Sequence, residues 1–346
     1  MNKKLIFFFS LLAIFFILPI FLSLIWQKIY LPKDFYSTQN KEFEIKKGQN
    51  IFQIANALSK ENLIKNKYFF VIYAILKGKH KKIQAGTYQL NAKMNIPEIL
   101  EKFTKGETLK IKITFSEGLT LQEIEERLKI FFPKIDLKKF KVKDFQKDFD
   151  FLKKVPPQVS LEGFLFPDTY FFDKRMSDRE IVKTFLKNFN KKLNSHLREE
   201  IKKQGKSIFE VVILASLIEK EVYNTPDCQN CKNLVAGILW KRLKNKIPLQ
   251  VDATLFYICQ QCKKNLTFKE AIKEAGKLKK IDSSYNTYKY LGLPPTPICN
   301  PGLESIKSAI FPEKSNYWYY LSTPDGKTIF SKTLKEHNLA KKKYLK

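Results

Sequence analysis

Arginine is scarce in this strongly basic chain. The 346 residues carry a formal net charge of +29, yet only five of the basic residues are arginines. Proteins that read nucleic-acid grooves or clamp phosphates favour the planar guanidinium fork of arginine over the point charge of lysine. The lysines are spread along the whole chain, which is typical of a compositional bias. We therefore expect no nucleic-acid partner, and at most an attraction to an anionic envelope or polymer.

A glycine-rich phosphate-binding loop is also missing, and the chain has only 12 glycines in all. A pyridoxal-phosphate enzyme needs a Schiff-base lysine together with a cradle for the cofactor phosphate. Nothing in the sequence predicts such a cradle. We therefore expect no cofactor for catalysis.

Charge is absent from one long stretch near the start, between Leu5 and Gln27. As a helix it would span about 34 Å, enough for the roughly 30 Å core of a bilayer. A cleavable signal peptide is the alternative, but the apolar run is long and no small-residue cleavage site follows it. We expect a cytoplasmic tail over residues 1–4, a single-pass transmembrane anchor in the cell membrane over 5–27, and an extracytoplasmic remainder.

Beyond the predicted anchor, the pattern indicates an α+β fold with an internal echo. Segments 45–48 and 115–118 each end at a glycine and lead into an amphipathic helix with matching apolar spacing. The first unit continues with a helix at 68–73, a strand at 84–90 and a helix at 96–103. The echo records either a duplication or the recurrence of a common strand-turn-helix unit.

The remainder predicts a mixed α/β region. A surface helix and loop over 134–157 precede a turn and strand at 161–172. One long amphipathic helix is expected over 178–203, then an apolar helix over 208–218 and a further helix over 234–245. The last hundred residues are dominated by turns and short strands.

Glu219 follows the apolar run, in the expected last turn of its helix. A carboxyl there feels the negative end of the helix dipole, and apolar neighbours disfavour its ionised form. Both effects favour the protonated carboxyl that a general acid requires. The alternative is a solvated glutamate beside Lys220 and Glu221. Since two helical steps rotate Glu221 by about 200°, we do not expect it to act on the same substrate.

Seven short motifs occur in a fixed order along the chain. They lie at 161–170, 214–221 (Leu-Ala-Ser-Leu-Ile-Glu-Lys-Glu), 235–243, 249–254, 285–288, 292–295 and 300–302. In this order they resemble the YceG-like family, whose members are membrane-anchored endolytic murein transglycosylases. The resemblance covers nearly everything from about residue 41 to the end. It implies a LysM-like α+β subdomain over 41–110, which contacts the glycan or orients the catalytic region, and a mixed α/β YceG-like lytic transglycosylase catalytic domain over 111–346.

The resemblance also implies a reaction. The family cleaves the bond between N-acetylmuramic acid and N-acetylglucosamine in peptidoglycan glycan strands without water, closing a 1,6-anhydro ring. Its catalytic glutamate falls on Glu219, which would protonate the leaving oxygen and then accept the proton of the muramyl 6-hydroxyl. Ordinary glycosidases need two carboxyl groups, whereas this reaction needs one. The family role is to terminate nascent strands beside peptidoglycan synthases, which are the expected protein partners.

Further motif positions are expected around the sugar. Tyr285, Asn286 and Tyr288 resemble a motif that lines the sugar groove in lytic transglycosylases, where a ring stacks on the pyranose and an amide binds its polar groups. The two tyrosines could equally belong to the core. This motif therefore predicts substrate-binding residues with a packing role as the alternative.

Two other motifs contribute expected substrate contacts. Gln250, Asp252 and Thr254 follow a family pattern, although Asp252 and Thr254 could instead form a helix-capping pair. Glu162 precedes a glycine turn, where it either binds a sugar or satisfies backbone donors of the turn.

The cysteines depart from the family pattern. Cys228 with Cys231, and Cys259 with Cys262, form two Cys-x-x-Cys knuckles, the ligand arrangement of a structural zinc site. Outside the membrane, disulfides are the competing interpretation. Either would tie together loops beside the Glu219 helix, and neither suggests redox catalysis. Cys299 is expected to be a small buried residue.

Two other function classes stay open. A non-catalytic peptidoglycan-binding or divisome scaffold would keep the anchor and the groove, but the presence of Glu219 in its expected string argues against it. A hydrolytic muramidase is the nearer chemical alternative. Muropeptide mass spectrometry separates the two reactions, because anhydro ends indicate transglycosylation and reducing ends indicate hydrolysis.

Overall fold

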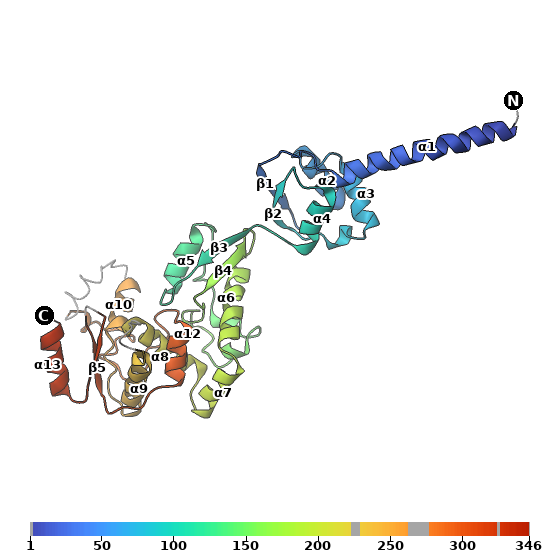
Figure 1. Ribbon diagram of the computed structural model, residues 1–346. Coiled ribbons are helices and arrows are strands. Elements are labelled where there is room, and N and C mark those ends of the chain that lie inside the picture. The colour runs from blue at the N-terminus through green and yellow to red at the C-terminus, as the bar shows by residue number, and fades with distance from the viewer. Residues whose placement is uncertain (1–2, 223–228, 262–276, 324–325, 346) are drawn as a thin grey trace. The chain divides into compact units, whose positions relative to one another are not determined.

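The computed structural model describes residues 3–222, 229–261, 277–323 and 326–345, as a mixed α+β fold (Figure 1). The chain divides into two compact units. Unit 1 comprises Met1–Lys112 with Phe171–Met176, and unit 2 comprises Ile113–Tyr170 with Ser177–Lys346. Every sheet in the described residues has two strands, in the pairs β1-β2, β3-β4 and β5-β6. The return of Phe171–Met176 to unit 1 is a long-range feature that the sequence pattern does not predict.

Unit 1 is an α+β module around an aromatic core. Its strands β1 and β2 pair antiparallel, with Phe43 opposite Tyr88. Both rings contact Phe103, and the Tyr88 hydroxyl donates to the Gln84 carbonyl at 2.6 Å. Its elements are α1 (Lys3–Tyr30), β1 (Asn40–Ile45), α2 (Ile51–Lys60), α3 (Lys67–Leu76), η1 (His80–Lys82), β2 (Gly86–Asn91) and α4 (Ile96–Lys105).

Helix α1 packs its last turns onto unit 1. Ile29 is buried in the core, Ile25 packs beside it, and the Tyr30 ring meets Tyr73 edge-on at 6.0 Å. Side chains of this helix are described at Leu12 and from Phe15 onward. Within the part of the chain that is described, no helix has both the length and the apolar character needed to cross a bilayer. The transmembrane anchor therefore stays a prediction.

Unit 2 is built around α8, which is buried from Val211 to Ile218. A helix that is apolar all round needs neighbours on every side, and α7, α9, α10 and α12 supply them. The elements that complete the chain are β3 (Lys110–Thr114), α5 (Leu121–Lys129), η2 (Val142–Asp144), η3 (Asp150–Leu152), β4 (Thr169–Asp173), α6 (Asp178–Lys192), α7 (Ser195–Lys203), α8 (Ile208–Glu221), α9 (Cys231–Lys244), α10 (Asp252–Gln261), α12 (Leu303–Ile310), β5 (Tyr319–Ser322), β6 (Thr328–Ser331) and α13 (Leu334–Tyr344).

The strand-turn-helix echo is present in the backbone. Gly48 and Gly118 both have positive φ, 83° and 78°, between a strand and a helix. Asn50 and Thr120 then cap α2 and α5 with capping boxes of the same geometry. The two segments therefore share their local structure, as the matching spacing predicts.

The long helix expected over 178–203 is wrong, because the chain forms two helices there. Leu193 leaves helical geometry at ψ 71°, and the Asn194 side chain accepts the Leu197 N–H to cap α7. Asparagine is a favoured N-cap residue, so Asn194 can start a new helix here. The expected long helix is therefore interrupted although its amphipathic pattern is continuous and the break contains no proline or glycine.

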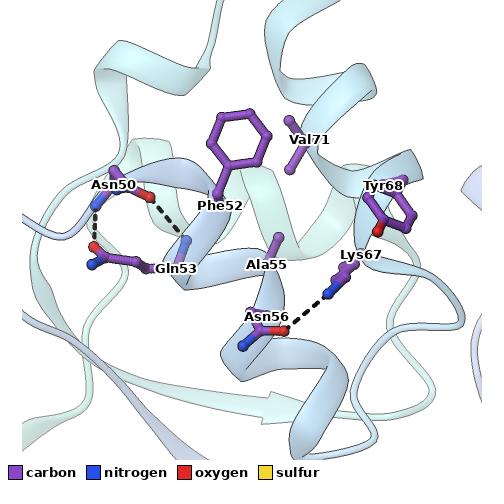
Figure 2. A pocket seen from close by; sticks show the side chains of 8 residues that line it. All are labelled: Asn50, Phe52, Gln53, Ala55, Asn56, Lys67, Tyr68 and Val71. Carbon is purple, nitrogen blue, oxygen red and sulfur yellow. Dashed lines mark hydrogen bonds between the residues drawn. The ribbon is translucent and has the colours of Figure 1, made fainter.

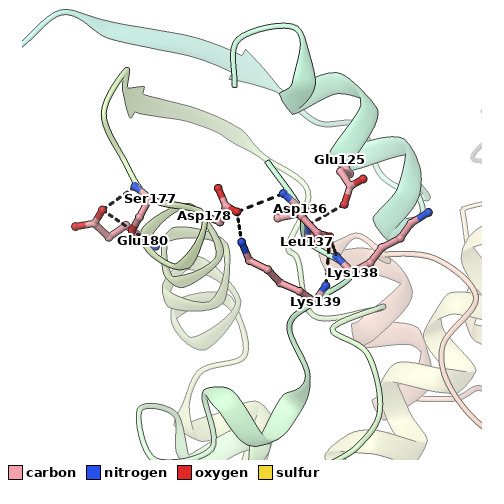
Figure 3. Close-up of polar contacts among 8 residues, drawn as sticks. All are labelled: Glu125, Asp136, Leu137, Lys138, Lys139, Ser177, Asp178 and Glu180. Carbon is pink, nitrogen blue, oxygen red and sulfur yellow. Dashed lines mark hydrogen bonds and ion pairs between the residues drawn. The ribbon is translucent and has the colours of Figure 1, made fainter. Parts of the chain in front are cut away.

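Segment 134–157 is not the surface helix that its composition predicts. It contains only the short turns η2 and η3 among the described elements, and Leu137 and Phe145 are fully buried. Polar contacts fix its start between two helices (Figure 3). Glu125 of α5 accepts the Leu137 N–H at 2.7 Å, and Asp178 of α6 pairs with Lys139 at 2.5 Å.

Glu125 provides a stability test of this packing. Replacing it by alanine leaves the buried Leu137 N–H without its acceptor, so we expect the free energy of unfolding to fall by about 2 kcal/mol. Burial opposes ionisation of Glu125, but Lys129 and the Leu137 N–H outweigh it and lower its pKa. The stabilisation by Glu125 is therefore present above the pKa that this carboxyl has in the unfolded chain. It is lost as the pH falls through the pKa that the carboxyl has in the folded protein.

Denaturant unfolding of Glu125→Ala at neutral and acid pH checks this expectation. Glu126→Ala is the matched control, because the neighbouring carboxyl is exposed and bonds only Gln122 among its described contacts. Equal effects of the two substitutions would contradict the assignment.

Candidate active site

Glu219 lies in a recess at the C-terminal turn of α8. Its side chain is only 9% exposed. The Oε2 atom accepts the backbone N–H of Gly302 at 2.9 Å, and Oε1 lies 3.4 Å from the Nζ of Lys232 on α9. The carboxyl is therefore oriented by two partners and does not point freely into solvent, which argues against the solvated-glutamate alternative.

Asn300 fixes the segment that carries Gly302. Its N–H donates to the Leu119 carbonyl at 2.8 Å, and its own carbonyl accepts the Gly118 N–H at 2.9 Å. Its side-chain oxygen accepts the Leu165 N–H at 2.8 Å, and its amide nitrogen donates to Glu162 at 2.9 Å. Three segments distant in sequence are thus held together by one residue that is 1% exposed. Asn300 thus gives the 300–302 segment a structural role, and Gly302 also supplies a donor to Glu219.

A second carboxyl, that of Glu117, approaches the same glycine. A Cβ atom on Gly302 would lie 1.9 Å from Glu117 Oε1 and 2.0 Å from its Cδ, so only glycine leaves room for this carboxyl. Partial burial raises the pKa of Glu117, and the Glu219 carboxylate raises it further, while Lys232 opposes the shift. Sequence reasoning missed this acid, although it belongs to the Gly118 turn of the internal echo.

The Glu162 side chain lies in the protein interior, where protein donors contact its carboxyl. It is 4% exposed, and both of its oxygens accept the Leu121 N–H, at 2.9 and 3.1 Å. Burial raises its pKa to about 8, against the effect of that N–H. Glu162 therefore accepts a backbone N–H at the start of α5 and the amide of Asn300, both from outside its own glycine turn, and a sugar contact stays a prediction.

Glu221 belongs to a different cluster from Glu219. Its Oε1 accepts the Ala253 N–H at the start of α10, at 3.1 Å. Burial raises its pKa to about 7, and the neighbouring Asp252 carboxylate adds to the shift. Asp252 in turn accepts the Tyr288 hydroxyl at 2.5 Å. The two glutamates thus contact different segments, in line with their expected separation around α8.

The motif residues near α10 divide into exposed and buried positions. Gln250 and Asp252 are exposed, with Gln250 at φ 55°. Thr254 is fully buried and donates to the Val251 carbonyl at 2.8 Å. Because this hydroxyl donates to a carbonyl, the bond does not cap a helix N–H, and sugar binding by Gln250, Asp252 and Thr254 stays a prediction.

The predicted groove motif is also partly structural. Asn286 is fully buried and its amide donates to the carbonyls of Lys279 and Ile281, so it holds a loop. Tyr285 and Tyr288 are half-buried, and the Tyr285 hydroxyl lies 2.6 Å from Thr296 Oγ1. Burial raises the pKa of both tyrosines. Sugar binding by these residues stays a prediction.

The cysteine knuckles fall partly outside the described residues, since Cys228 and Cys262 are not among them. Cys231 is disulfide-bonded, which favours the disulfide alternative over a thiolate ligand for zinc at that position. No cluster of three or more metal-ligating side chains occurs within the described ranges. Thiol titration combined with metal analysis separates the two interpretations. Cys299 is fully buried, as expected.

A cavity of about 380 Å³ lies in unit 1. It is lined from α2 and α3, with Phe52 and Tyr68 each 63% exposed and the Asn50, Gln53 and Asn56 amides nearby (Figure 2). The Lys67 ammonium donates to Asn56 at 3.2 Å along its wall. Exposed rings beside amides are suited to a ligand with both apolar faces and hydroxyl groups.

The chain is similar to known proteins over most of its length. A model of the YceG-like family matches residues 43–343. The chain is 35% identical to the endolytic murein transglycosylase of Bacillus subtilis (strain 168) over 330 residues, covering 90% of this chain and 86% of that protein. It is 28% identical to that of Streptococcus pneumoniae serotype 2 (strain D39), covering 89% of this chain and 59% of that protein. A crystal structure of a YceG-like protein from Listeria monocytogenes matches with a TM-score of 0.55 and 32% identity, covering 87% of this chain and 99% of that chain.

Proposed function

The chain belongs to the YceG-like family and is a lytic transglycosylase that acts on peptidoglycan, and we propose that Glu219 is its acid and base. The observation that carries this assignment is the recessed carboxyl of Glu219, oriented by the Gly302 N–H. Side chains that do proton transfer need a fixed geometry toward the reacting atom before they need a tuned acidity. Glu219 meets that first requirement.

The proposed reaction uses one carboxyl twice. Protonated Glu219 gives its proton to the glycosidic oxygen as the bond from the muramyl C1 to that oxygen breaks. The muramyl 6-hydroxyl oxygen then bonds C1, and its proton passes to the Glu219 carboxylate. Between the two transfers, the Gly302 N–H and the Lys232 ammonium stabilise the carboxylate. The product is a 1,6-anhydro end, and Glu219 recovers its starting state.

A hydrolytic muramidase is the second candidate, because a second carboxyl lies close by. Inverting and retaining glycosidases both place two carboxyl groups on either side of the scissile bond. Glu117 and Glu219 both approach Gly302, so a second carboxyl is present near the proposed acid. The chemistry of the product ends decides between the two reactions, because transglycosylation leaves anhydro ends and hydrolysis leaves reducing ends.

Replacing Glu219 by glutamine tests the assignment. The amide keeps the size of the side chain but cannot donate an acidic proton, so we expect formation of anhydro ends to fall by roughly 10²-fold or more. The measurement is mass spectrometry of muropeptides released from purified glycan strands by the full chain in detergent. Glu126→Gln, an exposed carboxyl on α5, serves as the control. Undiminished cleavage by Glu219→Gln would remove Glu219 from the mechanism.

We further propose that residues 5–27 anchor the chain in the cell membrane with the remainder outside. The charge-free run supports this, as does the docking of Ile25 and Ile29 onto unit 1, which would hold that unit next to the bilayer surface. We expect a reporter that works only outside the cytoplasm to be active when it is fused after residue 40. Activity of only a cytoplasmic reporter at that position would refute the topology.

Unit 1 is proposed as the LysM-like subdomain that contacts glycan through the cavity between α2 and α3. Phe52 and Tyr68 offer ring faces for a pyranose, and the adjacent amides can bond its hydroxyl and N-acetyl groups. Peptidoglycan synthases remain proposed partners on family grounds alone.

Alanine at Phe52 or Tyr68 tests this cavity. We expect each substitution to weaken binding of soluble glycan strands several-fold, because a stacking face is lost while the core of unit 1 is untouched. Binding is measured by sedimentation or calorimetry with the full chain. Leu76→Ala, an exposed apolar position of α3 outside the cavity lining, is the control. Equal loss in all three variants would indicate a non-specific effect.

A further inference from the structure

Helix α3 presents an apolar stripe to solvent. Ile72, Ile75 and Leu76 are spaced so that their side chains share one face of the helix, and they are between 47% and 77% exposed. The opposite face, with Phe70 and Ala74, is buried in the core of unit 1. None of the three exposed residues lines the cavity between α2 and α3. Adjacent exposed apolar side chains on one helix face are typical of a contact surface, separate here from that cavity.

The chain after α3 is a basic turn, Lys77–Lys82, with the sequence Lys-Gly-Lys-His-Lys-Lys. Gly78 takes φ 62°, and the N–H groups of Gly78 and Lys79 donate to carbonyls of α3 at 2.9 Å. The turn is therefore folded back onto the end of the helix. The sequence has no acidic residue between Glu61 and Glu98, so acids of the same segment do not balance this positive charge.

An aromatic row joins the basic turn to the proposed anchor. Trp26 stacks on Tyr30 with ring centres 5.5 Å apart, and the Tyr30 ring meets the Tyr73 ring of α3 at 6.0 Å. The Lys77 ammonium in turn lies 5.9 Å from the centre of the Tyr73 ring. Figure 1 shows α3 beside the base of α1, and the two helices are in contact. Since the charge-free run ends at Gln27, Tyr30 lies about 4.5 Å further along the helix, at the level of the headgroups of a bilayer that holds the run.

Further cations gather where α3 begins. Lys65 lies just before the helix, and its pKa is lowered by burial and then by the Lys28 and Lys33 ammonium groups. Like charges within interaction range repel one another, and an anionic surface relieves that repulsion. Cationic groups therefore lie at both ends of the apolar stripe, a composition that is typical of surfaces that bind anionic lipid.

We propose that the α3 stripe and the basic turn Lys77–Lys82 form a lipid-binding surface that lays unit 1 against an anionic bilayer. The inference rests on the proposed anchor, because α1 brings this surface to the membrane. Apolar side chains at the boundary between headgroups and acyl chains leave water, and lysines beside them are attracted to anionic headgroups. The long stem of lysine packs on apolar surface while its ammonium stays among the headgroups. An anionic polymer would leave the stripe in water, so lipid is the partner that uses both features.

The surface gives unit 1 a second point of contact with the membrane. A single transmembrane helix can tilt and rotate in the bilayer, so α1 alone does not fix the orientation of unit 1. Contact through α3 selects one orientation. The cavity between α2 and α3 belongs to the same unit, so its proposed glycan contact is then made at a fixed height above the bilayer.

Photo-crosslinking of the full chain in vesicles tests this surface. The photoreactive amino acid benzoylphenylalanine replaces Leu76 in one variant and Gln89 in another, in vesicles that contain phosphatidylglycerol or phosphatidylcholine alone. Gln89 is the matched control, because it is exposed on the solvent side of β2 in the same unit. Lipid adducts are identified by mass spectrometry of the modified peptide. We expect several-fold more adduct at position 76 than at position 89, and several-fold more with phosphatidylglycerol than without it.

Removal of charge tests the basic turn. Lys81→Gln combined with Lys82→Gln should lower the adduct yield at position 76 several-fold in phosphatidylglycerol vesicles. Added salt should do the same, because screening weakens the attraction to the headgroups. The control is Lys46→Gln combined with Lys47→Gln, an adjacent exposed pair between β1 and α2. Equal losses from the two pairs would contradict the role of the turn, and thermal unfolding shows whether each variant is folded.

A carbonate wash of the vesicles separates this inference from the anchor on which it rests. Chain that stays in the vesicles but forms no lipid adduct at position 76 overturns the inference and leaves the anchor standing. Chain that the wash releases overturns both. Adducts between two copies of the chain at position 76, in place of lipid, assign the stripe to an interface between copies and also overturn the inference.

Discussion

The hydrogen bond from the Gly302 N–H to Glu219 is the interaction on which the rest of the site depends. It connects the last turn of α8 to the start of α12 and fixes one oxygen of a recessed carboxyl at 2.9 Å. Proton transfer tolerates little error in the position of the acid, so the value of this bond lies in orientation more than in stability. The burial of α8 by its neighbours makes the Glu219 end of the bond rigid, and Asn300 does the same for the Gly302 end.

Buried polar side chains account for much of what the sequence motifs encode. Asn300, Glu162, Asn286 and Thr254 are all buried, and each satisfies a backbone group or another such side chain. Leaving any of these groups without a partner costs about 1–3 kcal/mol. Irregular loops pack around the end of α8 only because their carbonyls and N–H groups find these partners. Residues of a motif that resembles a sugar-binding sequence can therefore serve to hold a loop in place.

The two acids of α8 show how burial and partners divide similar residues between roles. Glu219 meets an ammonium and an N–H beside an exposed second carboxyl, whereas Glu221 accepts the Ala253 N–H at the start of α10. Burial raises the pKa of Glu221 to about 7, yet its carboxyl binds a backbone donor. A shifted pKa alone does not identify a catalytic acid, and access to substrate has to accompany it.

The sequence by itself determined the local elements, because caps, glycine turns and apolar periodicity act over a few residues. It placed Glu219 at the last turn of an apolar helix, and it predicted the turns at Gly48 and Gly118 that lead into α2 and α5. Only the tertiary structure decided which loops surround that carboxyl. Glu117, Lys232 and Gly302 come from segments far apart in the chain, and their approach depends on bonds through Asn300 that no local pattern encodes. Short-range propensities fix elements, whereas the partners of a buried polar group are set by packing across the whole unit.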